Sequence, residues 1–275
     1  MSELFRESWV LITGASSGLG AELARQLAAR HANLVLTARS IERLSAVAEE
    51  VRTRHGVAMH VISVDLAASD GPAKLIAEVE ALGVAIDHLV NNAGFGSLGR
   101  FVRTRPERET EMVRLNCEAV VCLTRHFLPG MIERGRGGVI QLSSTAGHQP
   151  TPFFTTYGAT KAFVLSFASA LSAELAGTGV RMMAFCPGPV PTGFQKAAGL
   201  AITDLKRGGL RARLSMMEAP EAVRRCLRAY EDGRSVYVPG FVNRVMTLAT
   251  KLAPRALVVN AAARSLSGGG RGSKT

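Results

Sequence analysis

Over roughly the first 190 residues, short uninterrupted apolar runs alternate with longer segments whose apolar side chains recur every three or four positions. The runs predict buried strands at Trp9–Thr13, Asn33–Thr37, Val57–Val64, Ile86–Asn91, Gly138–Ser143 and Val180–Phe185. The periodic segments predict helices at Leu19–Arg30, Ile41–Arg54, 70–82, 106–133 and 156–176. Apolar strands separated by helices are typical of a parallel sheet covered on both faces. The pattern therefore predicts an α/β fold, a doubly wound parallel sheet in three layers (α/β/α), with its ligand site at the carboxyl ends of the strands.

Length and composition are those of one large folded domain. The chain has 275 residues, 47% of them apolar and 20% charged, which excludes a disordered chain. No apolar run is long enough to predict a membrane-spanning helix, and the first residues lack the features of a secretory signal. We therefore expect a cytoplasmic protein.

The residues that usually hold metals or form disulfides show no organised pattern. The four cysteines form no CxxC pair, and the six histidines are scattered along the chain. We expect reduced thiols and no metal site.

The net charge of +11 belongs almost entirely to the C-terminal part of the chain. Residues 1–195 carry 18 basic and 17 acidic side chains, whereas residues 196–275 carry 15 and 5. We expect no nucleic-acid partner. The basic segment has two interpretations, a solvated face or a peripheral contact with the inner face of an anionic membrane. Phe241 to Leu266 mixes apolar and basic residues and is interrupted by Pro254, so it predicts two short helices that could instead close the fold or form an oligomer contact.

A glycine-rich segment joins the first predicted strand to the first predicted helix. Its sequence, TGASSGLG, runs from Thr13 to Gly20. Gly14 allows a tight turn, Gly18 lets the backbone approach a pyrophosphate, and Gly20 lets the helix pack close to the sheet. The helix N-terminus presents N–H groups and a positive dipole end to phosphate. Because no GK[ST] follows, the segment predicts dinucleotide binding and not a P-loop.

The end of the second predicted strand indicates which dinucleotide binds. NAD sites usually place a carboxylate there for the ribose 2′-hydroxyl, but the chain has Arg39 and no acid until Glu42. A guanidinium at this position suits a 2′-phosphate. The sequence favours NADP(H), with NAD(H) as a second cofactor that it could accept.

Tyr157 and Lys161 stand one helical turn apart at the start of the helix expected over 156–176. The spacing places both on one helix face, and an ammonium near 4 Å would lower the phenol pKa from about 10 toward about 7. A chance YxxxK is the competing interpretation. Ser144 ends a predicted strand at the ligand edge of the sheet, where its hydroxyl can hold a carbonyl oxygen. Asn116 has apolar neighbours in a helical stretch, which indicates that it faces inward.

Taken together, these motifs resemble the short-chain dehydrogenase/reductase superfamily, in its single-domain branch with a Rossmann fold. The likeness runs from about Ser8 to about Thr192 and includes the TGxxxGxG spacing, the NNAG motif at residues 91–94 and the YxxxK pair. It implies a catalytic tetrad of Asn116, Ser144, Tyr157 and Lys161. The cofactor residues that it implies are Gly14, Ser16, Ser17, Gly18, Leu19, Gly20, Arg39, Asp65, Leu66, Asn92, Ala93, Gly94, Tyr157, Lys161, Pro187, Gly188, Val190 and Thr192.

The resemblance also implies the reaction, a hydride transfer between the nicotinamide and a carbonyl or alcohol carbon. In reduction, Tyr157 would be the general acid, Ser144 would steady the substrate oxygen, Lys161 would lower the pKa of Tyr157 and bond the ribose, and Asn116 would anchor a water. We expect residues 1–192 to form the dinucleotide-binding and catalytic core, and residues 193–275 a substrate-covering segment and basic extension of the same domain. We expect a homodimer or homotetramer.

The substrate is indicated only by apolar residues after the Pro187–Gly188 motif. The segment 194–217 contains Phe194, Leu200, Ile202, Leu205, Leu210, Leu214, Met216 and Met217. An apolar cover favours a lipophilic carbonyl, and Phe95, Phe153 and Phe154 could line the same pocket. The alternative is that these are ordinary core-facing residues. His148 is close in sequence to Ser144 but is interpreted as a bystander.

Three functions are compatible with these observations. The first is an NADP-dependent oxidoreductase. The second is a redox sensor that holds NADP without turnover, against which the complete tetrad argues. The third is a membrane-surface protein that uses the basic C-terminal segment.

Overall fold

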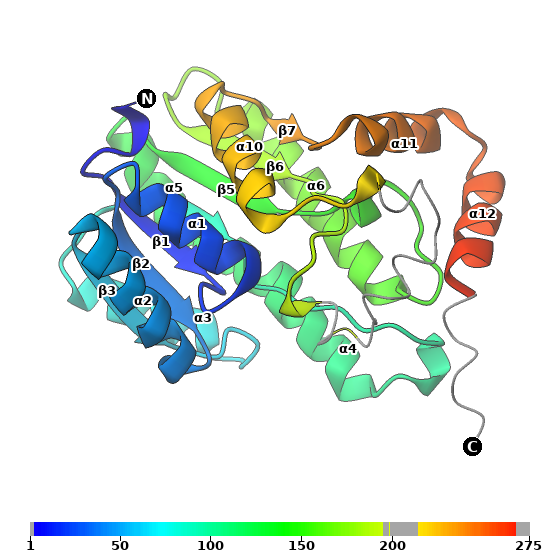
Figure 1. The fold of residues 1–275 in the computed structure, drawn as a ribbon, viewed down its shortest axis with the longest axis horizontal. Coiled ribbons are helices and arrows are strands. Elements are labelled where there is room, and N and C mark those ends of the chain that lie inside the picture. Colours follow the sequence, from blue (N-terminus) through cyan, green and yellow to red (C-terminus); the bar gives the residue numbers. More distant parts are fainter. Residues whose placement is uncertain (1–2, 195–197, 199–213, 268–275) are drawn as a thin grey trace.

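The computed structural model describes residues 3–194, 198 and 214–267. Seven parallel strands form a single sheet in the order β3-β2-β1-β4-β5-β6-β7 (Figure 1). The strands are β1 (Trp9–Thr13), β2 (Asn33–Ala38), β3 (Met59–Ser63), β4 (Ile86–Asn91), β5 (Gly138–Leu142), β6 (Arg181–Phe185) and β7 (Val236–Tyr237). The doubly wound α/β prediction is confirmed, and each of the six predicted strands is present within one or two residues of its expected bounds.

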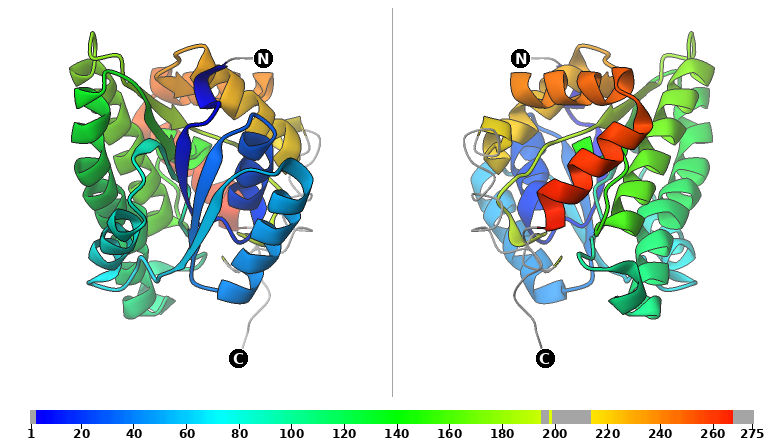
Figure 2. Two further views of the ribbon diagram at one scale, coloured as in Figure 1. Left: turned by 90° about the vertical axis from the view of Figure 1, so that its left-hand side faces the viewer. Right: turned by 90° about the vertical axis from the view of Figure 1, so that its right-hand side faces the viewer.

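Helices cover both faces of the sheet (Figure 2). On one face lie α1 (Gly18–Ala28), α2 (Ile41–His55) and α10 (Ala219–Glu231), and on the other lie α3 (Gly71–Ala81), α5 (Ala119–Glu133) and α6 (Thr155–Glu174). Successive side chains of a strand point to opposite faces, so Val10 and Ile12 pack in one apolar core and Leu11 in the other. Further helices in the described part of the chain are η1 (Glu3–Phe5), η2 (Phe101–Arg103), η3 (Arg114–Glu118), η4 (Thr145–His148), α4 (Pro106–Val113), α11 (Phe241–Leu252) and α12 (Arg255–Ser267).

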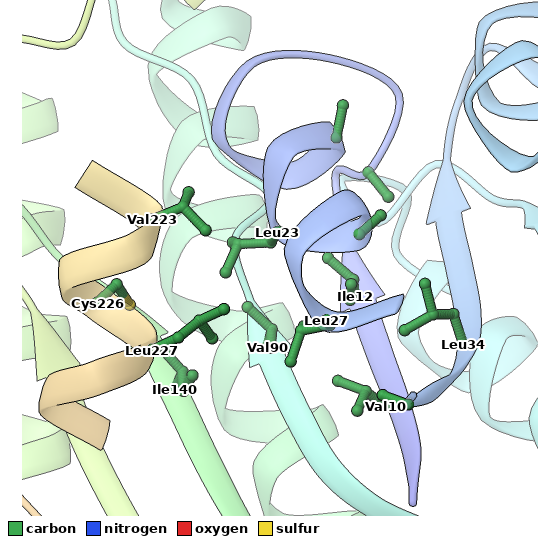
Figure 3. Close-up of a cluster of buried hydrophobic side chains, with 14 of the residues drawn as sticks. Val10, Ile12, Leu23, Leu27, Leu34, Val90, Ile140, Val223, Cys226 and Leu227 are labelled. Carbon is green, nitrogen blue, oxygen red and sulfur yellow. The ribbon is translucent and has the colours of Figure 1, made fainter. Parts of the chain in front are cut away.

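The C-terminal part of the chain completes the core. Val223 and Leu227 of α10 are buried with Leu23 and Leu27 of α1, as Figure 3 shows. β7 then joins the sheet beside β6 through hydrogen bonds from Ala184 N to Ser235 O and from Cys186 N to Tyr237 O, both 2.8 Å long. A strand of two residues is too short for hydrophobic periodicity to reveal, and the sequence did not predict it.

Two sequence expectations about helices are settled in this structure. The helix expected over 106–133 is divided into α4, a single π-helical turn (η3) and α5. The two short helices expected on either side of Pro254 are α11 and α12. Within the described residues, no helix has the length and apolar character needed to cross a bilayer.

A buried histidine on β4 connects the N-terminal segment to helix α10. The His88 side chain lies on β4 at 2% exposure, with Nδ1 2.9 Å from the Tyr230 hydroxyl and Nε2 3.3 Å from the Leu4 carbonyl. The carbonyl can only accept, so Nε2 carries the hydrogen and Nδ1 accepts from Tyr230. Burial lowers the pKa of His88 to about 4, because a charged imidazolium there would lose its hydration.

We expect this histidine to make the protein acid-sensitive. Below about pH 6.5 the unfolded chain protonates His88 while the folded chain does not, so the free energy of unfolding falls as the pH drops toward about 4. The titration of His88 alone should lower the free energy of unfolding by about 2 kcal/mol between pH 7 and pH 5. Urea unfolding of the wild type and of His88→Gln at both pH values measures it, since glutamine keeps a donor and an acceptor but does not titrate. Equal losses in the two proteins would contradict the assignment.

Candidate active site

A cavity of about 590 Å³ opens at the carboxyl ends of the central strands. This is the edge at which the sequence placed the ligand site. The predicted site residues on its wall are Gly14, Ser16, Ser17, Gly18, Leu19, Arg39, Asp65, Leu66, Asn92, Ala93, Gly94, Ser144, Tyr157, Lys161, Pro187, Gly188, Val190 and Thr192. Gly20 and Asn116 do not line the cavity and lie behind its wall.

The turn between β1 and α1 is built for close approach of the backbone. Gly14 has φ +67°, and a Cβ there would lie 2.9 Å from the Ala93 Cα. A Cβ on Gly20 would lie only 2.2 Å from the Gly14 carbonyl oxygen. A side chain at either position would therefore push the loop away from the sheet or from α1.

Two side chains fasten this turn to the end of β4. The Asn92 amide donates from Nδ2 to the carbonyls of Thr13 (2.8 Å) and Gly14 (3.1 Å). In return, the Thr13 hydroxyl accepts from the backbone N–H groups of Asn92 (3.0 Å) and Ala93 (2.9 Å). These bonds hold the NNAG motif and the glycine-rich turn as one unit. Thr13 belongs to the glycine-rich motif, but its sequence position alone does not indicate this role.

The N-terminus of α1 faces the cavity with its backbone donors available. Ser17 precedes the helix in an extended conformation, and its side chain makes no capping hydrogen bond. Ser16, Ser17 and Leu19 line the cavity there. Because the first N–H groups of a helix lack partners within it, this end suits the oxygens of a phosphate.

At the far end of the cavity, exposed arginines stand where β2 leads into α2. Arg39 and Arg43 both line the wall. Glu42, the nearest acid in sequence, accepts a hydrogen bond of 2.9 Å from the Ser40 hydroxyl, and its pKa is lowered by backbone and Ser40 hydrogen bonds. Asp65 lies on the same part of the wall, where its Oδ1 accepts from the Ala67 N–H at 3.0 Å.

The hydroxyl-bearing residues of the predicted tetrad come together at the other end. Tyr157, at the start of α6, is packed between two rings, with its centroid 4.3 Å from that of Phe154 and 5.4 Å from that of Phe194. Burial raises the pKa of Tyr157 to about 12, and a hydrogen bond with Ser144 acts in the opposite direction. Ser144 is the second residue after β5, and its Oγ also accepts from the Ala146 N–H at 3.1 Å.

Lys161 lies near Tyr157, as the spacing predicted, and is held there by a backbone carbonyl. Its Nζ is 5.7 Å from the Tyr157 ring centroid and donates to the Leu142 carbonyl at 2.7 Å. Burial lowers the pKa of Lys161 to about 8. Burial therefore raises the pKa of Tyr157 where the spacing alone predicted a fall toward 7, because helical spacing fixes a shared face but not the depth of burial.

Asn116 sits in the π-helical turn between α4 and α5 and is 1% exposed, so its predicted inward orientation is confirmed. Its Nδ2 donates to the Phe95 carbonyl and to the Thr160 hydroxyl, both at 3.0 Å, and its Oδ1 accepts from the Phe95 N–H at 3.2 Å. These contacts tie the segment after the NNAG motif to α6. Sequence reasoning missed Thr160, which carries no motif signal of its own.

Ser143, the neighbour of Ser144, has a separate structural role. Ser143 is buried and donates from Oγ to the Lys161 carbonyl at 2.7 Å. This bond joins the end of β5 to the turn of α6 that carries Lys161. It therefore helps to set the distance between Ser144 and Tyr157.

Apolar side chains line the cavity around Tyr157. Phe95, Leu98, Phe154 and Phe194 are on the wall, whereas Phe153 is not. Of the expected covering residues, Leu200, Ile202, Leu205 and Leu210 lie outside the described residues, Leu214 is exposed, Met216 is half-buried and Met217 packs against the core. His148 lies in η4 and is not on the cavity wall. No cluster of three potential metal ligands occurs among the described residues.

Comparison with known proteins gives a consistent family likeness. The family model described as "short chain dehydrogenase" matches residues 8–201. A very-long-chain 3-oxoacyl-CoA reductase of Aspergillus fumigatus is 37% identical over 177 residues, which are 63% of this chain and 51% of that protein. The chain thus spans about half the length of these curated relatives.

Solved structures resemble the whole chain. A short-chain dehydrogenase from Sphingobium yanoikuyae in complex with NADPH is 30% identical with a TM-score of 0.78, covering 98% of both chains. A bulky-bulky ketone specific alcohol dehydrogenase from Comamonas testosteroni is 28% identical with a TM-score of 0.73, covering 98% of this chain and 96% of its own.

Proposed function

The chain belongs to the short-chain dehydrogenase/reductase family, and from that premise we propose that it interconverts a lipophilic ketone and a secondary alcohol with NADP(H) as cofactor. Membership makes the protein an oxidoreductase that acts on carbonyl and alcohol groups. The proposal of a lipophilic substrate and of NADP(H) rests on one observation, a single cavity whose two ends differ in chemical character. Phosphate-binding groups and Arg39 stand at one end, and Tyr157 and Ser144 stand among phenylalanines at the other.

The residues present fit an NADP(H) molecule. Gly14 holds the backbone in a conformation that brings the turn against the NNAG motif, and the α1 N-terminus offers donors to a pyrophosphate. Arg39 on the wall suits a 2′-phosphate, and Asp65 suits the adenine end. Structural relatives include one in complex with NADPH and one complexed with NADH, and Arg39 on the cavity wall favours NADP(H), with NAD(H) as a second cofactor.

The chemistry at the reacting carbonyl divides between cofactor and protein. When bound, NADPH supplies the hydride that reaches the carbonyl carbon. Tyr157 donates its hydroxyl proton to the substrate oxygen, and Ser144 donates a hydrogen bond to the same oxygen. Burial keeps the phenol protonated at neutral pH, which is the state that can donate in the direction of reduction.

The positively charged group near Tyr157 stabilises the product side of this proton transfer. A phenolate forms as Tyr157 gives up its proton, and the buried Lys161 ammonium is close enough to favour the negative charge. Lys161 is held in place by the Leu142 carbonyl, and Asn116 fixes the backbone of the adjoining loop through Phe95. In alcohol oxidation the same groups act in reverse, with Tyr157 accepting the proton.

The substrate end favours an apolar molecule. The rings of Phe154 and Phe194 enclose Tyr157, so a substrate oxygen that reaches its hydroxyl lies among aromatic side chains. Similar proteins are named for 3-oxoacyl thioesters and for bulky ketones, both of which carry large apolar groups beside the carbonyl. We propose a substrate of that kind.

A panel of ketones, with turnover measured by NADPH oxidation, tests this proposal. We expect kcat/KM to rise from small to bulky apolar ketones, and Phe194→Ser to lower it about tenfold or more for the bulky ones while changing it little for the smallest. Phe101→Ser is the control, because Phe101 is 60% exposed and does not line the cavity. Higher kcat/KM for small polar carbonyls, or equal effects of Phe194→Ser across the panel, would contradict an apolar substrate.

A further inference from the structure

Helix α11 carries its apolar side chains on the outside. Phe241, Val245, Leu248 and Leu252 recur at helical spacing and are 81%, 49%, 58% and 79% exposed. Asn243 and Thr247, on the opposite side, are 4% and 7% exposed. A helix that merely closes a core shows the reverse arrangement, with apolar residues inward and polar residues outward. We call the four exposed residues the α11 stripe.

Polar contacts hold α11 in this orientation. The Asn243 amide donates from Nδ2 to the carbonyls of Ser215 and Pro239, both at 3.0 Å. The Thr250 hydroxyl contacts the His148 carbonyl at 3.5 Å, on the loop that follows Ser144. Rotating the helix to bury the stripe would break these bonds and leave the Ser215 and Pro239 carbonyls without their donor. The stripe is therefore directed outward by the fold itself.

The charged residues of the chain segment that carries the stripe are all basic. The sequence contains seven lysines and arginines after Asp232 and no acid. Lys251 near the end of α11 and Arg255 at the start of α12 are both exposed beside the stripe. Figure 2 shows α11 and α12, in orange and red, together on the outer surface of one end of the molecule.

The exposed apolar stripe and its basic neighbours fit an anionic lipid surface better than a second copy of the chain. A second copy of the chain docked on the same patch by a two-fold axis would bring cations together, with no acid on these helices to pair them. An anionic lipid surface offers both an apolar interior for the stripe and negative charge for the flanking cations. We propose that the α11 stripe, with Lys251 and Arg255, docks the enzyme peripherally on an anionic membrane surface.

Docking there would bring the bilayer close to the catalytic cavity. Through Asn243 and Thr250, α11 rests on segments that border the cavity, since Thr145 and Ala146 of η4 lie on its wall. The docking proposal stands independently of the identity of the substrate.

Co-sedimentation of the full chain with vesicles tests the proposal. We expect binding to vesicles of equal parts phosphatidylcholine and phosphatidylglycerol, little binding to phosphatidylcholine alone, and weaker binding as salt rises. Leu248→Ser/Leu252→Ser should lower the partition coefficient at least about tenfold, and Lys251→Glu/Arg255→Glu should do so on anionic vesicles only. The matched control is Phe101→Ser/Val102→Ser, which removes two exposed apolar side chains from η2 and should bind as the wild type does.

Three outcomes would overturn the proposal. They are absence of binding to anionic vesicles, equal binding to neutral and anionic vesicles, and self-association in solution that Leu248→Ser/Leu252→Ser abolishes without any vesicle binding. Thermal unfolding of the same variants provides a check on folding. Because the stripe is exposed, its variants should melt at the wild-type temperature, and a marked fall would show that the stripe is part of the core.

Discussion

Replacing Tyr157 by phenylalanine should reduce the rate of ketone reduction by a factor of about 100 to 10,000, or roughly 3–5 kcal/mol of transition-state stabilisation. The substitution removes only the proton donor, because phenylalanine keeps the ring that packs between Phe154 and Phe194. NADPH affinity, measured by fluorescence, should stay close to that of the wild type. Tyr237→Phe is the matched control, since Tyr237 lies on β7 away from the cavity wall and its loss should leave turnover unchanged.

A second substitution separates proton donation from cofactor binding. Lys161→Ala should impair turnover and NADPH affinity together, because the proposed ammonium acts on both the phenol and the cofactor.

Retention of more than about a tenth of wild-type turnover by Tyr157→Phe would exclude Tyr157 as the general acid.

Arg39→Asp should shift the enzyme from NADPH toward NADH. A charge-assisted contact between a guanidinium and a phosphate contributes about 1.5–3 kcal/mol, so the ratio of kcat/KM for NADPH to that for NADH should fall at least about tenfold. The introduced carboxylate adds repulsion against the 2′-phosphate and an acceptor for a ribose hydroxyl. Steady-state kinetics with both cofactors measure the ratio.

The neighbouring arginines make this experiment specific. Arg43 also lines the cavity, so Arg43→Asp reports whether the 2′-phosphate is bound there instead. Arg54→Asp, on the exposed end of α2 and off the cavity wall, controls for a general change in charge. An unchanged ratio in Arg39→Asp together with a fall in Arg43→Asp would reassign the phosphate contact.

The sequence predicted the parts of this molecule whose signal is local. Each long buried strand was visible as an apolar run, and the glycine-rich turn was visible because Gly14 and Gly20 occur where a strand meets a helix. Residues that end parallel strands meet at one edge, so the structure places Asn92, Ser144 and Gly188 on one cavity wall, as expected.

The features that the sequence did not predict depend on how segments distant in the chain pack together. The pKa of Tyr157 is controlled by the depth of its burial, which no spacing along a helix can reveal. Thr13 and Thr160 act by bonding to segments far away in the chain, and β7 exists only because β6 offers an edge to pair with. The outward direction of the α11 stripe likewise required the positions of Asn243 and Thr247.

The π-helical turn at Arg114–Glu118 also bears on how this chain tolerates insertions and deletions. A π turn holds one residue more than an α turn, so the turn absorbs an extra residue and shifts by one the sequence positions that face the sheet in α5 relative to those in α4. Deleting one residue of the turn other than Asn116 would restore a regular helix and keep the inward face of α5, including Ala119 and Leu123, against the sheet. A deletion inside α5 itself would instead rotate the residues on one side of it by about 100°, so a single-codon deletion should be tolerated far better in the turn than in the helix that follows.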